Sequence, residues 1–582
     1  MSPLVEKTAD ELARFRIGVS LIRNFRLSYL RKVFSLISQG EKIALIALLL
    51  IVFVSGVISL RHGYNALTVP VAASGGTYTE GILGQPRYIN PIYATSDADR
   101  ILAQLIFSSL YHYDQNGELV PDLAEGQPTV SEDQKEYTVK LKQNIKWHNG
   151  DMFTADDVVF TIASIQNTET KSPLQNQWLN TLAKKVDDYT LTFTNTEISG
   201  PFIHNLTLPI LHQGAWAGVA PVDFPTSDNN LKPIGTGPYT LTEIAQQTNK
   251  KILSISLSSF KDYYAGQPHI DTVTLRFLDS YEQLVTSFHS DEIDGAGIVP
   301  LETNATISGK KNSATAYIIP LAQYQAVFFN LNHPILSDKT VRKALLAATD
   351  RDKLNQEILE GRARSIYGPF INEHLTLNTD SQTADITAAE KLLDDAGWKR
   401  DPSTGFRTKN DVILQFVIST NDASSNVKAA QFLAESWKAL GVNVNVGSMQ
   451  SKDLTSSLIR PRTFDVLVFA QQLGADPDPF LFWHSSQAKD PGLNITGFNN
   501  TEADRLISQA RTSIDDKTRA ARYTEFTNLL REEVPAIFLN QSVYLYTVDS
   551  AVKNINLNVL YDPIFRFNNI HTWYINESRD WK

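Results

Sequence analysis

YTVKLKQNIKWHNGDMFTADDVVFTIASIQN, residues Tyr137 to Asn167, carries the most informative pattern of the chain. Apolar and polar side chains alternate from Tyr137 to Leu141, which is typical of a strand with one buried face. Asn149-Gly150 predicts a turn, because both residue types tolerate a positive φ. Thr154 then stands where a helix N-cap belongs, with Asp157 three positions later as the reciprocal cap. Apolar residues follow at helical spacing and predict one buried stripe, namely Val158, Ile162 and Ile165.

No residue of this segment is arranged as a nucleophile, a general base or a metal shell, so the segment is interpreted as scaffold. Its central block, WHNGDMFTADDV at Trp147–Val158, resembles the F-H-D-G-T-P-F-T-A-E-D-V block of the family 5 extracellular solute-binding proteins. Members of that family are the receptors of peptide, nickel and related ABC importers. The resemblance implies the two-lobed periplasmic-binding fold known as cluster C.

Further segments resemble the family's motifs in the same order along the chain. The clearest is PIGTGPY at Pro233–Tyr239, close to the family's vGTGPY; without a following Lys-Ser/Thr it does not suit a phosphate loop. The other segments are Gly75–Gly81, Asn90-Pro91, Gly117–Ala124, Asp262–Pro268, Glu292–Gly295, Phe328–Asn330, Val341–Leu345, Thr349–Arg351, Ala389–Trp398, Asn494–Arg511 and Pro535–Phe538. The chain is therefore identified as a member of the family from about residue 75 to residue 545.

Membership implies an α/β fold of the periplasmic-binding-protein type II (cluster C): two lobes joined by two crossing strands, with the ligand enclosed between them. Two apolar, aromatic-rich segments suit the crossings, Ile319–Phe329 and Phe538–Tyr546. The expected divisions are lobe I at 75–320, including the extra cluster C subdomain, lobe II at 325–540, and a C-terminal return to lobe I at 541–582.

An apolar run precedes the receptor portion. Ile43–Leu60 is uncharged and lies between Lys42 and Arg61, close to the roughly 20 residues that a spanning helix needs. Residues 1–42 hold eight basic and four acidic residues, which leaves a net −14 for the rest of a chain of net charge −10. The positive-inside rule then predicts a cytoplasmic N-terminus and an extracytoplasmic body. We expect an uncleaved, single-pass signal anchor in the cell membrane at 43–60, followed by a linker at 61–74.

The basic segment 1–42 has its own pattern. Thr8 to Glu11 is a candidate capping box, and apolar residues recur at threes and fours between arginines. Such an amphipathic helix suits an anionic membrane surface or a membrane partner. The basic residues are explained equally well if they only set the orientation of the anchor in the membrane.

Composition excludes several classes of function. The 582 residues contain no cysteine, so disulfides, thiolate metal sites and cysteine nucleophiles are excluded. The eleven histidines show no pair at helical metal spacing, and the acidic exterior disfavours nucleic-acid binding. A chance S-x-x-K at Ser425–Lys428 lacks the partner motifs of penicillin-binding enzymes. We therefore expect no catalytic residue, no cofactor and no metal.

The chain departs from the family's pattern at the position of the ligand anchor. In the family's peptide binders an aspartate pairs with the α-ammonium of the peptide, in a segment that resembles GADPDPF at Gly474–Phe480. The Asp-Pro pair is repeated, so the aspartate aligns with Leu473 in one register and with Ala475 in the other. Neither is acidic, and Asp476 can substitute only with a shift of one residue. The free-amine anchor, and with it an ordinary peptide ligand, is in doubt.

Asp476 and Asp478 are equally explained as solvated or capping carboxylates beside prolines. The remaining ligand-binding candidates lie just beyond this loop, at the first crossing strand and in the first strand-loop: Trp483, His484, Tyr324, Gln325, Tyr88 and Asn90. Each is also explained by core or hinge packing.

The sequence thus predicts an anchored receptor that captures a peptide or peptide-like solute by hinge closure and works with an ABC permease and ATPase. One alternative is an anchored sensor or scaffold of the same fold without transport. Another is a receptor for a nickel chelate, haem, a sugar or an opine-like compound.

Overall fold

The computed structural model describes residues 36–297, 314–371 and 383–582. The chain divides into two units, one ending at Ala72 and including Glu577–Lys582, the other spanning Ala73–Asn576. The amphipathic helix expected within residues 1–42 lies almost entirely outside the described residues.

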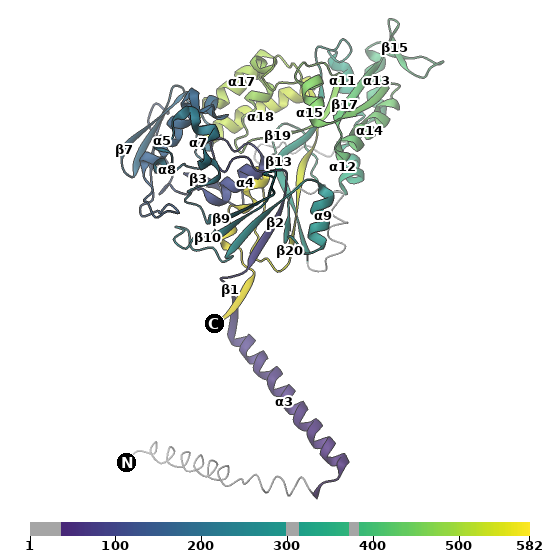
Figure 1. Cartoon of the computed structure of the whole chain (residues 1–582). Coiled ribbons are helices and arrows are strands. Elements are labelled where there is room, and N and C mark those ends of the chain that lie inside the picture. Colours follow the sequence, from purple (N-terminus) through teal and green to yellow (C-terminus); the bar gives the residue numbers. More distant parts are fainter. Residues whose placement is uncertain (1–35, 298–313, 372–382) are drawn as a thin grey trace, which may run out of the picture. The chain divides into compact units, whose positions relative to one another are not determined.

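The described part of the first unit contains a long helix, α3 (Gln39–Leu67) (Figure 1). The helix is apolar, and none of its side chains is buried. Its most apolar 18-residue window has a mean hydropathy of 3.0, and within the described ranges it is the helix that is long and apolar enough to cross a membrane. The backbone N–H of Ser38 donates to the Glu41 carboxylate at 2.8 Å, so the helix begins with a capping box.

The structure has a helix and a strand over most of residues 61–74, where the sequence predicts a linker. α3 continues to Leu67, and β1 (Thr68–Ala73) follows at once and pairs with β21 (Asn576–Trp581) near the C-terminus. Arg579 Nε donates to Thr68 Oγ1 at 2.8 Å, and the Lys582 N–H donates to the Leu67 carbonyl at 3.0 Å. β1 and β21 are therefore held together beside the end of α3.

The second unit is built on a mixed ten-stranded sheet. At its middle, β13 (Ala314–Phe329) and β20 (Ala536–Asp549) run antiparallel along most of their lengths (Figure 1). The complete order is β18 (Asn443–Met449), β17 (Gln415–Asn421), β19 (Val466–Gln472), β13, β20, β12 (Gly295–Ala296), β2 (Thr77–Leu83), β11 (Thr272–Leu278), β10 (Ile252–Ser259) and β9 (Tyr239–Gln246).

Smaller sheets and helices surround this sheet. The small sheets are β3 (Tyr111–Tyr113) with β4 (Leu119–Pro121); β5 (Thr129–Val130), β6 (Glu136–Lys140), β8 (Thr190–Asn195) and β7 (Thr181–Asp187); and β14 (Lys399–Arg400), β15 (Arg407–Lys409) and β16 (Val412–Ile413). The helices are α4 (Asp97–Ile106), α5 (Ala155–Gln166), α6 (Gln175–Trp178), α7 (Phe202–Asn205), α8 (Gln213–Trp216), α9 (Tyr281–His289), α11 (Lys339–Ala347), α12 (Arg351–Leu359), α13 (Ile386–Asp395), α14 (Ser424–Lys438), α15 (Ser451–Leu454), α16 (Phe480–Trp483), α17 (Thr501–Arg511) and α18 (Asp516–Glu533).

The two long strands contribute to different hydrophobic cores along their lengths. Ile319 and Tyr546 belong to a core that also contains apolar residues of 552–573. Further along the same strands, Val327 and Ile537 belong to a second core, and a third core lies around Phe328. A two-lobed mixed α/β fold with two shared strands results; the exact lobe limits remain predictions.

The segment Tyr137–Asn167 folds as its local sequence pattern predicts. Alternate residues of β6 and its extension are buried, and so is the apolar stripe of α5. The Thr154 N–H donates to Asp157 Oδ2 at 3.0 Å, which confirms the predicted capping interaction. Asp157 also accepts from Trp147 Nε1 at 3.3 Å and from the Gln213 N–H at 2.9 Å. The block is scaffold because its polar groups bind each other.

The glycine turn of the GTGP segment packs against the same block. A Cβ on Gly235 would lie 1.8 Å from the Ile106 carbonyl oxygen, so only glycine fits there. The His148 ring accepts from the Gly235 N–H at 3.3 Å and reaches the Gly237 carbonyl at 3.0 Å. Burial lowers the pKa of His148 to about 4. This turn therefore joins β9 to α4 by close backbone contact.

Candidate functional site

Asp476 is almost fully enclosed and forms a salt bridge with Arg519. Arg519 Nη2, from the first turn of α18, donates to both carboxylate oxygens at 2.7 and 2.6 Å. The two side chains are 8% and 9% exposed. Burial opposes ionisation of Asp476, but hydrogen bonding to His204 and the charge of Arg519 hold its pKa below the ordinary value. The carboxylate is thus ionised and already paired.

A residue from the other side of the molecule reaches the same carboxylate. His204 lies on α7, within predicted lobe I, and its Nε2 is 3.3 Å from Asp476 Oδ2. Its other nitrogen, Nδ1, is 2.7 Å from the Tyr113 hydroxyl, which can donate to it. In that tautomer, Nε2 carries the proton and donates to the carboxylate. The contact joins residues of predicted lobe I to a residue of predicted lobe II.

The backbone also makes close contact here. The Gly200 N–H donates to the Arg511 carbonyl at 2.9 Å. A Cβ at Gly200 would lie 2.4 Å from the Ser513 carbonyl oxygen and 3.1 Å from Arg519 Nε. Glycine therefore permits residues 200–204 to lie directly against α17 and α18.

Beside this contact lies a cavity of about 890 Å³, which we call the amide cavity. Its walls come from residues 176–205 on one side and from residues 480–481 and 508–512 on the other. Carboxamides, hydroxyls and a few apolar groups line it, with Glu197 and Arg511 as the charged members. The Nδ2 of Asn195 is buried there and has no hydrogen-bond partner among the described residues. Such a lining suits a neutral ligand rich in hydrogen-bonding groups.

Asp478 belongs to the wall behind this cavity. Its Oδ1 accepts from the Phe480 N–H at 3.0 Å, and its Oδ2 lies 3.4 Å from Arg511 Nε. The Arg511 guanidinium stands 4.3 Å from the centre of the Phe480 ring. Burial raises the pKa of Asp478. Its role in the structure is to position the start of α16.

Other predicted ligand contacts are placed in the protein interior. Tyr324 and Trp483 are fully buried and both pack against Phe538, with ring centres 5.2 and 5.8 Å away. Gln325 donates to Asn426 Oδ1 at 2.5 Å and accepts from Asn540 Nδ2 at 3.0 Å. These contacts fit the core and hinge packing that the sequence also allowed.

The last three predicted residues are likewise occupied by protein. The His484 ring stacks on Phe480 with centres 4.4 Å apart, and its Nδ1 is 2.9 Å from Ser486 Oγ. Asn90 donates to Asn230 Oδ1 at 2.9 Å, and Tyr88 packs on Tyr93 with ring centres 5.3 Å apart. The structure therefore brings together Asp476, Asp478 and His484 around α16, and leaves Tyr88 and Asn90 elsewhere. Ligand contacts for all eight remain predictions.

Sequence reasoning missed the cation that pairs with Asp476. Arg519 is one of several arginines in a helix whose pattern is ordinary, and its partner is 43 positions away. His204 has no local motif either. No three metal-ligating side chains gather as a cation shell in the part of the chain that is described.

Comparison with known proteins agrees with this architecture. Residues 118–492 match the model of the bacterial extracellular solute-binding proteins, family 5. The chain is 27% identical to the oligopeptide-binding protein AppA of Bacillus subtilis over 512 residues, covering 86% of this chain and 92% of that protein. The AppA structure in complex with a nonapeptide matches with 26% identity and a TM-score of 0.68, covering 87% of this chain and 100% of that one. NikZ from Campylobacter jejuni in complex with Ni(L-His) shows the same fold, with 23% identity and a TM-score of 0.71 over 86% of this chain and 99% of that one.

Proposed function

This chain belongs to the bacterial extracellular solute-binding proteins of family 5, and from that membership we propose that it is the membrane-anchored receptor of an ABC importer. Proteins of this family bind substrates for ABC transporters and are not enzymes, and we assign no catalytic role to this chain. The proposed action is capture of a peptide or peptide-like solute between the lobes, followed by delivery to a permease and its ATPase.

The observation that carries the proposal is the contact between His204 and Asp476, which joins the two predicted lobes beside the amide cavity. In a hinge mechanism, ligand contacts to both lobes stabilise the closed form. A cavity walled by residues 176–205 and residues 480–512 is completed only when these segments approach each other. Closure and ligand enclosure are therefore coupled in this proposal.

The same pairing argues against a free peptide amine as the main recognition group. An ammonium ion would have to displace Arg519 from Asp476, leaving a buried guanidinium without its partner, at a cost of about 3–5 kcal/mol. Carboxamides and hydroxyls of the amide cavity instead suit the backbone groups of a peptide, whatever its terminus. We therefore propose recognition that is independent of the N-terminal charge.

A second candidate is a ligand that is not a peptide, favoured by the same occupied carboxylate. NikZ, which has the same fold, was crystallised in complex with Ni(L-His). Calorimetric titration of the chain in detergent distinguishes the two candidates. The ligands are peptides of the same sequence with either a free or an acetylated N-terminus. Equal affinity for both forms supports the proposal; strong preference for the free amine contradicts it. Binding of a nickel–histidine chelate or a sugar, with no peptide binding, selects the second candidate.

The anchor is tested separately. α3 holds the receptor in the membrane in this proposal, with its N-terminus cytoplasmic, so the local concentration near a permease is high. Removal of residues 1–62 is expected to leave ligand affinity unchanged and to weaken uptake by cells. Loss of affinity in the purified shortened chain would contradict the separation of anchor and receptor.

A further inference from the structure

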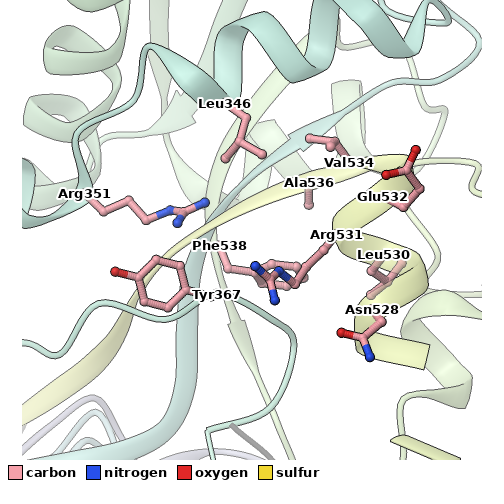
Figure 2. Close-up of a pocket in the computed structure, with 10 residues that line it drawn as sticks. All are labelled: Leu346, Arg351, Tyr367, Asn528, Leu530, Arg531, Glu532, Val534, Ala536 and Phe538. Carbon is pink, nitrogen blue, oxygen red and sulfur yellow. The ribbon is translucent and has the colours of Figure 1, made fainter. Parts of the chain in front are cut away.

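A second pocket lies wholly within the predicted second lobe, away from the amide cavity. It encloses about 310 Å³ between the start of α12, the end of α18 and the start of β20. Figure 2 shows its lining, with the guanidinium groups of Arg351 and Arg531 turned toward the same space. Neither cation takes part in the contacts of the amide cavity, although Arg531 lies on the same helix, α18, as Arg519.

Arg351 is a buried cation whose charge is only partly compensated, by the Tyr367 hydroxyl and by the charge of Asp352. The residue is 6% exposed, and within the described ranges no acidic group forms a salt bridge with it and its Nε has no hydrogen-bond acceptor. Its guanidinium stands 4.7 Å from the centre of the Tyr367 ring. The adjacent carboxylate, Asp352, accepts a hydrogen bond from Ser365 at 2.6 Å. Burial lowers the pKa of Arg351 to about 10, the direction expected for a poorly compensated buried charge.

The second cation adds to this positive field. Arg531 is exposed at the rim, and no salt bridge to it occurs in the described part of the chain. The one acidic residue of the lining, Glu532, is engaged by Lys343 at 2.8 Å and by Lys339 at 3.2 Å. The pocket therefore combines a buried cation that is only partly compensated with a second, solvent-exposed cation, and an entering anion would compensate the buried charge.

The apolar part of the lining indicates that the anionic ligand also has an apolar body. Its wall is formed by aliphatic and aromatic side chains, Leu346, Leu530, Val534, Ala536 and Phe538. A water molecule needs only about 10–15 Å³ of such space, so the pocket holds several atoms more than a bare ion. A guanidinium pairs well with a planar carboxylate. We propose that this pocket binds a small monocarboxylate, with its carboxylate between Arg351 and Arg531 and its aliphatic body against the apolar wall.

Calorimetric titration of the full-length chain in detergent with sodium butyrate tests the proposal, with sodium phosphate and sodium chloride at matched ionic strength. We expect saturable binding of butyrate with one site per chain. Arg531→Gln should weaken it about tenfold, or about 1.4 kcal/mol, since one charged hydrogen bond to the carboxylate is lost. Arg351→Met should abolish it and should not destabilise the chain, because the substitution removes a buried charge that is only partly compensated.

Lys517→Gln is the matched control, since Lys517 is an exposed cation near the other end of α18, and it should leave butyrate affinity unchanged. Because Arg531 is exposed, the Arg531→Gln variant should fold even if the Arg351→Met variant does not fold. Absence of saturable binding, equal binding by all variants, or preference for phosphate over butyrate would each overturn the proposal. Ligand binding in the amide cavity should be unaffected by Arg531→Gln, so this result and that of the proposed function are independent.

Discussion

The salt bridge between Asp476 and Arg519 permits a quantitative test. Removing one partner of a buried ion pair leaves the other charge uncompensated and costs about 3–5 kcal/mol, whereas replacing both is often neutral. With side chains 8% and 9% exposed and contacts of 2.6 and 2.7 Å, this pair meets the conditions of that rule. Asp476→Asn and Arg519→Gln should each destabilise the receptor by that amount, and the double variant by much less.

Thermal unfolding, followed by intrinsic tryptophan fluorescence in detergent, is the assay. If the predicted second lobe, 325–540, unfolds as one domain of about 150–250 residues, 1 kcal/mol corresponds to roughly 2–4 °C, so each single variant should unfold roughly 10 °C earlier. Arg522→Gln on the same helix is the control. Its partner Glu525, at 2.8 Å, is on the surface, and such pairs contribute about 0–1 kcal/mol.

The sign of the pH effect follows from the lowered pKa of Asp476. The stability that the ionised carboxylate contributes is present above the unfolded value of 3.8 and is lost as the pH falls through the lower folded value. Asp476→Asn should therefore flatten the acid limb of the stability profile. Single variants that shift the midpoint by less than 2 °C, or a double variant whose loss equals the sum of the two, would refute this reasoning.

Three other outcomes are expected. Because burial lowers the pKa of His148 from 6.5 to about 4, the unfolded chain gains that proton first, so stability should fall from pH 6.5 toward 4, and His148→Asn should flatten this interval in pH-dependent unfolding. Gly235→Ala should prevent accumulation of folded protein, since its Cβ would overlap the Ile106 carbonyl, whereas Gly218→Ala, with open space around it, should be tolerated in the same expression and unfolding tests. Arg579→Gln should increase amide hydrogen exchange in β1 while leaving exchange in β13 unchanged, because the guanidinium donates to Thr68.

The sequence predicted what depends on local pattern. The strand, turn and capped helix around Trp147 could be recognised because their signals lie within a few residues of each other. The family and the fold class followed from several such blocks in order. The partners of Asp476 could not be recognised, because an arginine 43 positions away in an ordinary helix gives no signal. The strand at 68–73 was interpreted as a linker for the same reason, since its contact with Arg579 spans 511 positions.

If α3 anchors the receptor in a membrane as proposed, the contact between Arg579 and Thr68 affects how proteolysis could release the receptor. The body is joined to the helix-bearing unit by two peptide connections, one at Ala72–Ala73 and one at Asn576–Glu577. A protease that cut the first would leave the second intact, with β21 still paired to β1 and so to α3. Release would require this two-stranded sheet to open as well. A single nick in the juxtamembrane region is therefore insufficient to free the receptor, and an epitope tag fused after Lys582 would emerge beside the end of α3.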